Sequence, residues 1–292
     1  MTISRTNTLP ADSFRARIDR PIFIMSAPRS GSTLLFETLA QSPDLFTIGR
    51  ESHNVIEGIP AFSTRARGFK SNRLVEADAE PGLIELLAQG FYERLHDRDG
   101  CQASGRVRML EKTPKNALRV PFFAAAWPDA TFLFLYRDAR QTIASMIEAW
   151  LSGMFRTYPR LPGWTGDPWS LLLVPGWEKL KGLPLPHIVA QQWVTAMNAL
   201  IDDLASLPPQ RVRSISYDVV IAAPQRAMED LSASLDFSWD RVLGAHLPRS
   251  KTTVSEPARD KWRANEEVIE MVWPLVKATD EKARAFAELH RV

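Results

Sequence analysis

The sequence predicts an α/β fold, a three-layer sandwich in which helices flank a central parallel β-sheet. Short apolar runs alternate along the chain with longer helical patterns, which is typical of parallel, doubly wound sheets. The runs are apolar at nearly every position, as expected of strands buried on both faces. The chain has 292 residues, of which 45% are hydrophobic and 24% charged, and this ordinary globular composition can form a large core.

The first strand and helix are predicted near the N-terminus. Residues 1–20 are polar and are expected to be a loosely attached lead-in, so that residues 21–292 form a single domain. Pro21 to Ser26 is an apolar run bounded by turn residues and predicts a buried strand. The leucines between Ser32 and Gln41 recur at helical spacing and predict a helix, which a Ser-Pro pair ends.

Later apolar runs are expected to join the same sheet. They cover residues 106–110, 131–136 and 211–217. Helices are expected after Asp138, which is placed to cap its helix, and at about 187–206 and 222–235. Ligands of such sheets bind at the carboxyl ends of the strands, so the turns that follow the strands are candidate sites.

Residues 150–186 depart from this rhythm. The segment contains four tryptophans and six prolines without clear periodicity, and we expect an irregular insertion that folds over the edge of the sheet. Two interpretations are open. It is either a surface excursion anchored by buried tryptophans, or a lid or acceptor pocket.

Charge and cysteine content exclude several classes of protein. Thirty-six Lys and Arg against 34 Asp and Glu give a net charge of +2, too balanced for a general nucleic-acid binder. A single cysteine, Cys101, excludes an internal disulfide framework. The N-terminus has no apolar signal segment, and no run of about 18 apolar residues occurs. We therefore expect a cytoplasmic protein without a nucleic-acid or membrane partner; the sequence does not indicate its oligomeric state.

The turn after the first strand has the chemistry of an anion site. A strand that turns sharply into a helix points unpaired N–H groups at the helix N-terminus, where the helix dipole adds positive charge. Gly31 allows a close backbone approach, Ser30, Ser32 and Thr33 belong to the same turn, and Arg29 adds a planar set of donors. Considered alone, the turn could also be an ordinary connection.

A second candidate site follows the strand at 131–136. Arg137 lies at the strand end, and Ser145 lies two turns along the next helix, so both could reach one phosphate across the start of that helix. The alternative is that Arg137 and Asp138 only form a helix cap with a neighbouring ion pair.

The two stretches together resemble a known family. "PRSGSTLL" and "FLYRDARQTIASM" are similar to the paired signatures of sulfotransferases that use 3′-phosphoadenosine 5′-phosphosulfate (PAPS), closest to the tyrosylprotein and glycan branch. The resemblance implies a P-loop-like fold, the cofactor PAPS with product PAP, and no metal. It implies that the first turn holds the 5′-phosphosulfate and that Arg137 and Ser145 hold the 3′-phosphate. The Gly-Lys-Ser/Thr ending of triphosphate-binding loops is absent, as expected, because a sulfuryl group in transit carries less charge than a phosphoryl group.

Glu51 is the candidate general base. By resemblance it matches the second Glu of a Gly-Glu-Glu-Thr stretch, although Arg50 and His53 depart from the family pattern. His53 is the second candidate, because its ordinary pKa suits a base at neutral pH. If residues 51–53 run extended, both side chains point the same way and could act as a pair.

Lys112 is the candidate for stabilising the leaving group. It follows the strand predicted at 106–110, near the first turn, where the family has a Lys-x-Pro stretch. With Arg29 it would take the role that a metal has in kinases. Lys115 is expected only to attract the cofactor.

The resemblance implies that a late basic loop before a tryptophan closes the adenosine end. Its candidates are Lys251, Ser255, Lys261, Trp262 and Arg263. Tyr217, at the end of the last predicted strand, could frame the nucleotide or simply cap the core.

The acceptor is the least specified part of the prediction. It is expected to be a hydroxyl or amine of a small molecule, a glycan or a peptide, with an acidic group near Arg65 and Arg67. Two alternative functions stay open. A kinase-like P-loop transferase would need a loop Lys after Gly31 and carboxylates for Mg²⁺, and a non-catalytic nucleotide-binding protein would keep only the fold.

Overall fold

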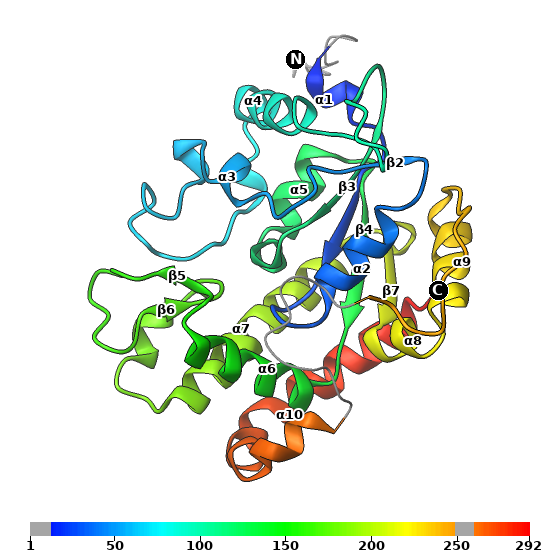
Figure 1. The fold of residues 1–292 in the computed structure, drawn as a ribbon. Coiled ribbons are helices and arrows are strands. Elements are labelled where there is room, and N and C mark those ends of the chain that lie inside the picture. The colour runs from blue at the N-terminus through cyan, green and yellow to red at the C-terminus, as the bar shows by residue number, and fades with distance from the viewer. Residues whose placement is uncertain (1–12, 249–259) are drawn as a thin grey trace, which may run out of the picture.

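A five-stranded parallel sheet in the order β2-β3-β1-β4-β7 forms the centre of the computed structural model, which describes residues 13–248 and 260–292 (Figure 1). Its strands are β1 (Ile22–Met25), β2 (Leu45–Phe46), β3 (Arg108–Lys112), β4 (Thr131–Tyr136) and β7 (Val212–Ser216). The central strand β1 is fully buried, and Ile22 pairs with Leu110 on one side and Thr131 on the other. The predicted α/β class and the parallel sheet are confirmed.

The strand predicted at residues 106–110 begins two residues later than expected. Glu111 and Lys112 form its last two positions, and both side chains are buried. The sequence prediction ended this strand at residue 110. Charged side chains are rarely buried unless they are paired. Here both have partners: Lys112 pairs with Glu51, and Glu111 accepts hydrogen bonds from three neighbouring side chains.

Helices cover both faces of the sheet and complete the three layers. Ile22 and Ile24 of β1 pack with α2 (Ser32–Leu39), α8 (Tyr217–Ala222) and α9 (Pro224–Leu235). Phe23 and Met25 point to the opposite face, as alternate strand residues do. That face is covered by α4 (Pro81–Tyr92), α5 (Val120–Ala126), α6 (Ala139–Ser152), α7 (Leu185–Ala205) and α10 (Glu266–Leu289).

Asp138 caps α6 as predicted, and its carboxylate accepts a hydrogen bond from the N–H of Gln141 at 3.2 Å. The long helix α10, which the sequence prediction did not assign, contains Pro274. Its buried Asp280 accepts hydrogen bonds from the Tyr136 hydroxyl at 3.0 Å and from the N–H of Ala139 at 3.2 Å. The C-terminal helix therefore anchors the β4–α6 turn.

The lead-in is packed from Ser13 onward, and this differs from the loose attachment expected. Ser13 caps the short helix α1 (Phe14–Arg17), which lies against α4. Ile18 is buried and forms a bridge with Val107. Within the described ranges, no helix combines the length and apolar character needed to cross a membrane.

The Trp-rich insertion is anchored by its aromatic side chains. It contains a short antiparallel pair, β5 (Arg156–Tyr158) and β6 (Trp169–Ser170). The ring of Trp169 lies 5.0 to 6.0 Å from the rings of Trp150, Trp164 and Trp177. The insertion lies beside α6 and α7 in Figure 1.

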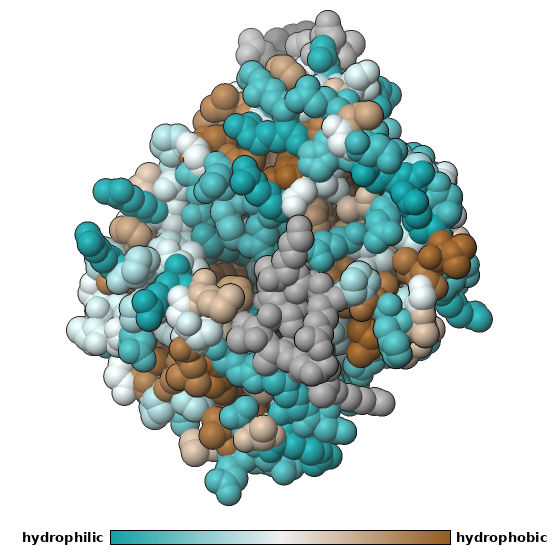
Figure 2. Space-filling view, viewed as in Figure 1, coloured by the Kyte–Doolittle hydropathy of each residue, from teal (hydrophilic) through white to brown (hydrophobic). Residues whose placement is uncertain are grey.

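Hydrophilic side chains cover most of the molecular face that is seen in the view of Figure 1, with smaller hydrophobic areas between them (Figure 2).

Candidate active site

A pocket of about 1260 Å³ lies at the carboxyl ends of the central strands. Segments far apart in the sequence line it: the turn after β1, residues 49–58, the end of β3, one side of α6 and the β5–β6 insertion. Pockets for single small ligands are commonly about 300–1000 Å³. This one therefore has room for a nucleotide together with a second substrate.

The turn after β1 has the backbone of an anion cradle. Gly31 has φ +89° and caps α2, and a Cβ at this position would lie 2.3 Å from Cε2 of Tyr217. Arg29 also adopts a left-handed conformation, with φ +67°. Ser32 and Thr33 line the pocket as predicted, whereas Ser30 is buried and is not part of the lining. Ser30 is 1% exposed, so its side chain does not contribute to the pocket surface.

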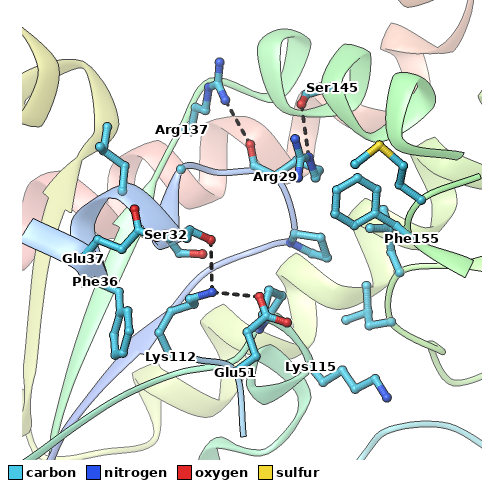
Figure 3. A pocket seen from close by; sticks show the side chains of 18 of the residues that line it. Arg29, Ser32, Phe36, Glu37, Glu51, Lys112, Lys115, Arg137, Ser145 and Phe155 are labelled. Atoms are coloured by element: carbon cyan, nitrogen blue, oxygen red, sulfur yellow. Dashed lines mark hydrogen bonds and ion pairs between the residues drawn. The ribbon is translucent and has the colours of Figure 1, made fainter. Parts of the chain in front are cut away.

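The two predicted anion sites meet in one cluster (Figure 3). Arg137 Nη1 donates to the backbone carbonyl of Arg29 at 3.0 Å, and Arg29 Nε donates to Ser145 Oγ at 3.4 Å. The Arg29 guanidinium packs 4.6 Å from the centre of the Phe155 ring, and that of Arg137 packs 4.4 Å from the ring of Tyr217. These aromatic contacts hold both cations in place.

Burial and mutual repulsion make this cluster favourable for an anion. Burial lowers the pKa of Arg29, and the nearby charge of Arg137 lowers it further. Burial likewise lowers the pKa of Arg137. Arginine keeps its charge in proteins, so the two guanidinium groups concentrate positive potential at the mouth of the cradle.

Glu51, His53 and Lys112 form a hydrogen-bonded trio beside the cradle. Lys112 Nζ donates to Glu51 Oε1 at 2.8 Å and to Thr33 Oγ1 at 3.1 Å. His53 Nε2 lies 2.7 Å from Glu51 Oε2. Residues 51–53 do not run extended, because Ser52 has ψ 18° and His53 begins α3 (His53–Ile56). The Glu51–His53 pair forms across this turn instead.

The trio holds the Glu51 carboxyl in its ionised form. Burial raises its pKa, but the His53 hydrogen bond and the charge and hydrogen bond of Lys112 outweigh burial and lower the pKa to about 2. A carboxylate with so low a pKa is a weak base until one of these partners withdraws.

The late basic segment reaches the pocket only in part. Lys261 and Trp262 line it, and Lys261 Nζ donates to Glu148 Oε2 at 2.6 Å. Arg263 does not line the pocket and pairs instead with Asp260 and Glu266, at 3.5 and 3.3 Å. Position 263 lies on the outer side of its short 3₁₀ turn, where its own neighbours bind it. The candidates Lys251 and Ser255 lie outside the described residues.

Other predicted contacts are redirected to structural partners. Lys115 lines the pocket, but its ammonium donates to Glu57 Oε1 at 2.8 Å. Arg65 and Arg67 do not line the pocket, and Arg67 pairs with Asp78 at 2.6 Å. The prediction that these two arginines bind an acidic group of the acceptor is therefore not supported by the pocket lining.

Several residues of the site were not predicted from the sequence. They include Glu37, Gln141, Glu148, Phe155, Leu171, Leu172 and His246, all of which line the pocket. Phe155 belongs to the Trp-rich insertion, so one of the two interpretations of that segment, a contribution to the pocket, matches its position. Among the described residues, no group of three His, Cys, Asp or Glu side chains is arranged to hold a metal ion.

The chain matches a family model and several curated relatives. A family model described as "Sulfotransferase family" matches residues 21–241. The chain is 22% identical over 231 residues to a "Putative protein-tyrosine sulfotransferase" of Caenorhabditis briggsae, covering 79% of this chain and 70% of the relative. It is 22% identical over 252 residues to the "Protein-tyrosine sulfotransferase" of Drosophila melanogaster, covering 86% of this chain and 45% of that protein. The chain thus spans about two thirds of the length of the Caenorhabditis briggsae relative and under half of the length of the Drosophila protein.

Solved structures support the fold. The structure of a sulfotransferase from Alicyclobacillus acidocaldarius matches with a TM-score of 0.52 and 14% identity, covering 93% of this chain and 97% of the other. A sulfotransferase from Mycobacterium tuberculosis matches with a TM-score of 0.50 and 16% identity, covering 89% and 77% of the two chains.

Proposed function

The chain belongs to the sulfotransferase family, and on that premise we propose that it transfers the sulfuryl group of PAPS to an acceptor hydroxyl or amine and releases PAP. The observation that carries the proposal is the contact between the two arginine sites. Arg137 donates to the Arg29 carbonyl at 3.0 Å, so one cluster of donors can bind two anionic groups of a single nucleotide.

The residues present fit such a nucleotide. The turn with Arg29, Gly31 and Thr33 would hold the 5′-phosphosulfate at the N-terminus of α2, where backbone N–H groups favour an anion. Arg137 and Ser145 would hold the 3′-phosphate. PAPS supplies an activated sulfuryl group joined through oxygen to a phosphate that can depart.

The proposed chemistry uses the trio of Glu51, His53 and Lys112. Glu51 accepts the proton of the acceptor hydroxyl while the acceptor oxygen forms a bond to sulfur. Bound PAPS would supply the sulfuryl group, whose bond to the bridging oxygen would break as the bond to the acceptor oxygen forms. Lys112 and Arg29 would stabilise the negative charge left on that oxygen. When Lys112 turns toward this oxygen, its bond to Glu51 weakens and the carboxylate becomes more basic. His53 keeps Glu51 oriented.

We favour an aromatic peptide hydroxyl as the acceptor. The relatives named above are protein-tyrosine sulfotransferases, which supports a peptide substrate. Phe155, Leu171 and Leu172 add apolar surface to the pocket on the side of the insertion, which suits an aromatic side chain. Glycan and small-molecule hydroxyls are the competing acceptors.

The test is turnover of PAPS with one acceptor from each class: a tyrosine peptide, an oligosaccharide and a small phenol. We expect equal amounts of PAP and sulfated product by mass spectrometry, with and without EDTA. Separate titrations with PAP and with Mg-ATP distinguish a kinase-like enzyme, which would bind ATP and require the metal. Binding of PAP without turnover of any acceptor would instead favour a non-catalytic nucleotide-binding protein.

A further inference from the structure

We propose that Glu111, a carboxylate buried beneath the pocket, is a positioning residue that keeps Glu51 in place during proton transfer. This inference rests on the proposed function of Glu51 as the base. Glu111 is 3% exposed and does not line the pocket, so it acts on the reaction only through other residues.

Three donors converge on the Glu111 carboxylate. Ser52 Oγ and Thr113 Oγ1 donate to Oε1 at 2.5 and 2.7 Å, and Asn116 Nδ2 donates to Oε2 at 2.6 Å. The backbone N–H of Ser52 in turn donates to Thr113 Oγ1 at 2.8 Å. Both the side chain and the main chain of residue 52 are therefore tied to Glu111, directly or through Thr113.

The arrangement joins two pairs of consecutive residues. Glu51 binds Lys112, and Ser52 binds Glu111. Because neighbouring residues of a strand point to opposite faces, Lys112 reaches the pocket while Glu111 points away from it. A shift of the 51–52 segment by one residue would break both contacts. Glu111 therefore fixes the register in which Glu51 faces Lys112.

The contact between Glu111 and Ser52 matters most when Lys112 no longer binds Glu51. In the proposed reaction Lys112 turns toward the departing oxygen, and Glu51 then depends on His53 and on its own main chain. The side chain of His53 is 36% exposed, whereas Ser52 is fully buried. The buried contact of Ser52 with Glu111 is the one that solvent and substrate do not reach.

Burial raises the pKa of Glu111, but donors face both of its oxygens. Glu111→Gln tests the proposal, because glutamine keeps the shape but replaces one of these accepting oxygens with an NH₂ donor. We expect kcat to fall by about 10- to 100-fold, as a shift of the base by about 1 Å does, while the KM for PAPS and the affinity for PAP change less than about 3-fold. Ser52→Ala keeps the backbone contact and should lose less activity. Asp203→Asn is the matched control: it breaks a half-buried ion pair with Arg73 outside the pocket and should leave kcat unchanged.

A double-mutant cycle separates positioning from general damage. In a Glu51→Gln background, Glu111→Gln should cost less than about 3-fold, because the residue that it positions is already disabled. A full loss in that background, or an unchanged kcat for Glu111→Gln alone, would overturn the proposal.

A second readout does not need turnover. The titration of the Glu51 carboxyl, followed by ¹³C NMR, should show its pKa rising in Glu111→Gln from about 2 toward the ordinary 4.5. An unchanged titration contradicts the proposal. If the native enzyme turns over no acceptor, the proposed function fails, and this titration alone decides whether Glu111 positions Glu51.

Discussion

Gly31→Ala gives a direct test of the anion cradle, because the structure shows two separate reasons for glycine at this position. Its φ of +89° lies in the left-handed region, which costs other residues about 1–2 kcal/mol. A Cβ would also lie 2.3 and 2.4 Å from two atoms of the Tyr217 ring. That ring is 7% exposed and lies under the Arg137 guanidinium, so it cannot move away freely. Overpacking of this kind adds about 1–3 kcal/mol.

The expected loss of unfolding free energy for Gly31→Ala is therefore about 2–5 kcal/mol. Gly100→Ala is the matched control, because Gly100 has φ +85° and no atom within 4 Å of its would-be Cβ. It should lose only the backbone contribution of about 1–2 kcal/mol. Urea unfolding measures both variants. In a Tyr217→Ala background, the cost of Gly31→Ala should fall to that of Gly100→Ala.

The same variant should weaken PAP binding. A displaced Tyr217 ring no longer holds the Arg137 guanidinium in place, and Arg137 then loses a charge-assisted hydrogen bond to PAP. The loss of one such bond costs about 1.5–3 kcal/mol of binding free energy, or about 10- to 150-fold in Kd. Calorimetric titration with PAP measures this, and Gly100→Ala should bind like the native protein. Equal stability losses for the two glycine variants, or unchanged PAP affinity in Gly31→Ala, would refute the reasoning.

Three further predictions concern the charged residues of the pocket. Glu51→Gln should keep PAP affinity and lower kcat by about 10²- to 10⁴-fold; if turnover is unchanged, His53 becomes the candidate base. Arg29→Ala and Arg137→Ala should each raise the Kd for PAP by about 10- to 100-fold by calorimetry, and an unchanged Kd for both would remove the cradle from the binding site. The pKa of Glu51 is lowered from 4.5 to about 2 in the folded protein, so its stabilising effect is complete above about pH 4.5 and is lost as pH falls toward 2. Urea unfolding from pH 6 to 3 should show a loss of stability that is smaller in Glu51→Gln, where this titration is absent, and identical slopes would contradict the proposed trio.

The elements that sequence reasoning predicted well are those with strong local signals. The strand predicted at 131–136 is β4 residue for residue, and Asp138 caps the following helix as expected. The helix α10 was not assigned. Pro274 interrupts its pattern, and the helix packs mainly on α7 and less on strands β4 and β7. The strand β3 was placed two residues early because its last residues are charged and owe their burial to partners elsewhere.

In the candidate site, too, some residues were predicted from local sequence signals and others depend on the tertiary structure. Arg29, Gly31 and Arg137 were found from turns that follow strands and Ser145 from the helix after the second turn, and the structure brings them together. The contribution of Phe155 could not be predicted, because its segment has no periodicity that would fix its direction. Ser30 and Arg263 were placed correctly along the chain, but the direction of a side chain within a tight turn depends on the backbone torsions.

The sequence by itself determined that two turns with the donors of an anion site follow strands of one parallel sheet. Because the carboxyl ends of parallel strands share one edge, it also predicted that these turns would lie at the same edge, and the pairing of β1 with β4 makes them neighbours. Only the tertiary structure decided the partners: Glu51 with Lys112, Ser52 with Glu111 and Arg29 with Ser145. Local conformation is set by a few adjacent residues, whereas these contacts join residues about sixty or more positions apart and depend on strand register and burial across the whole core.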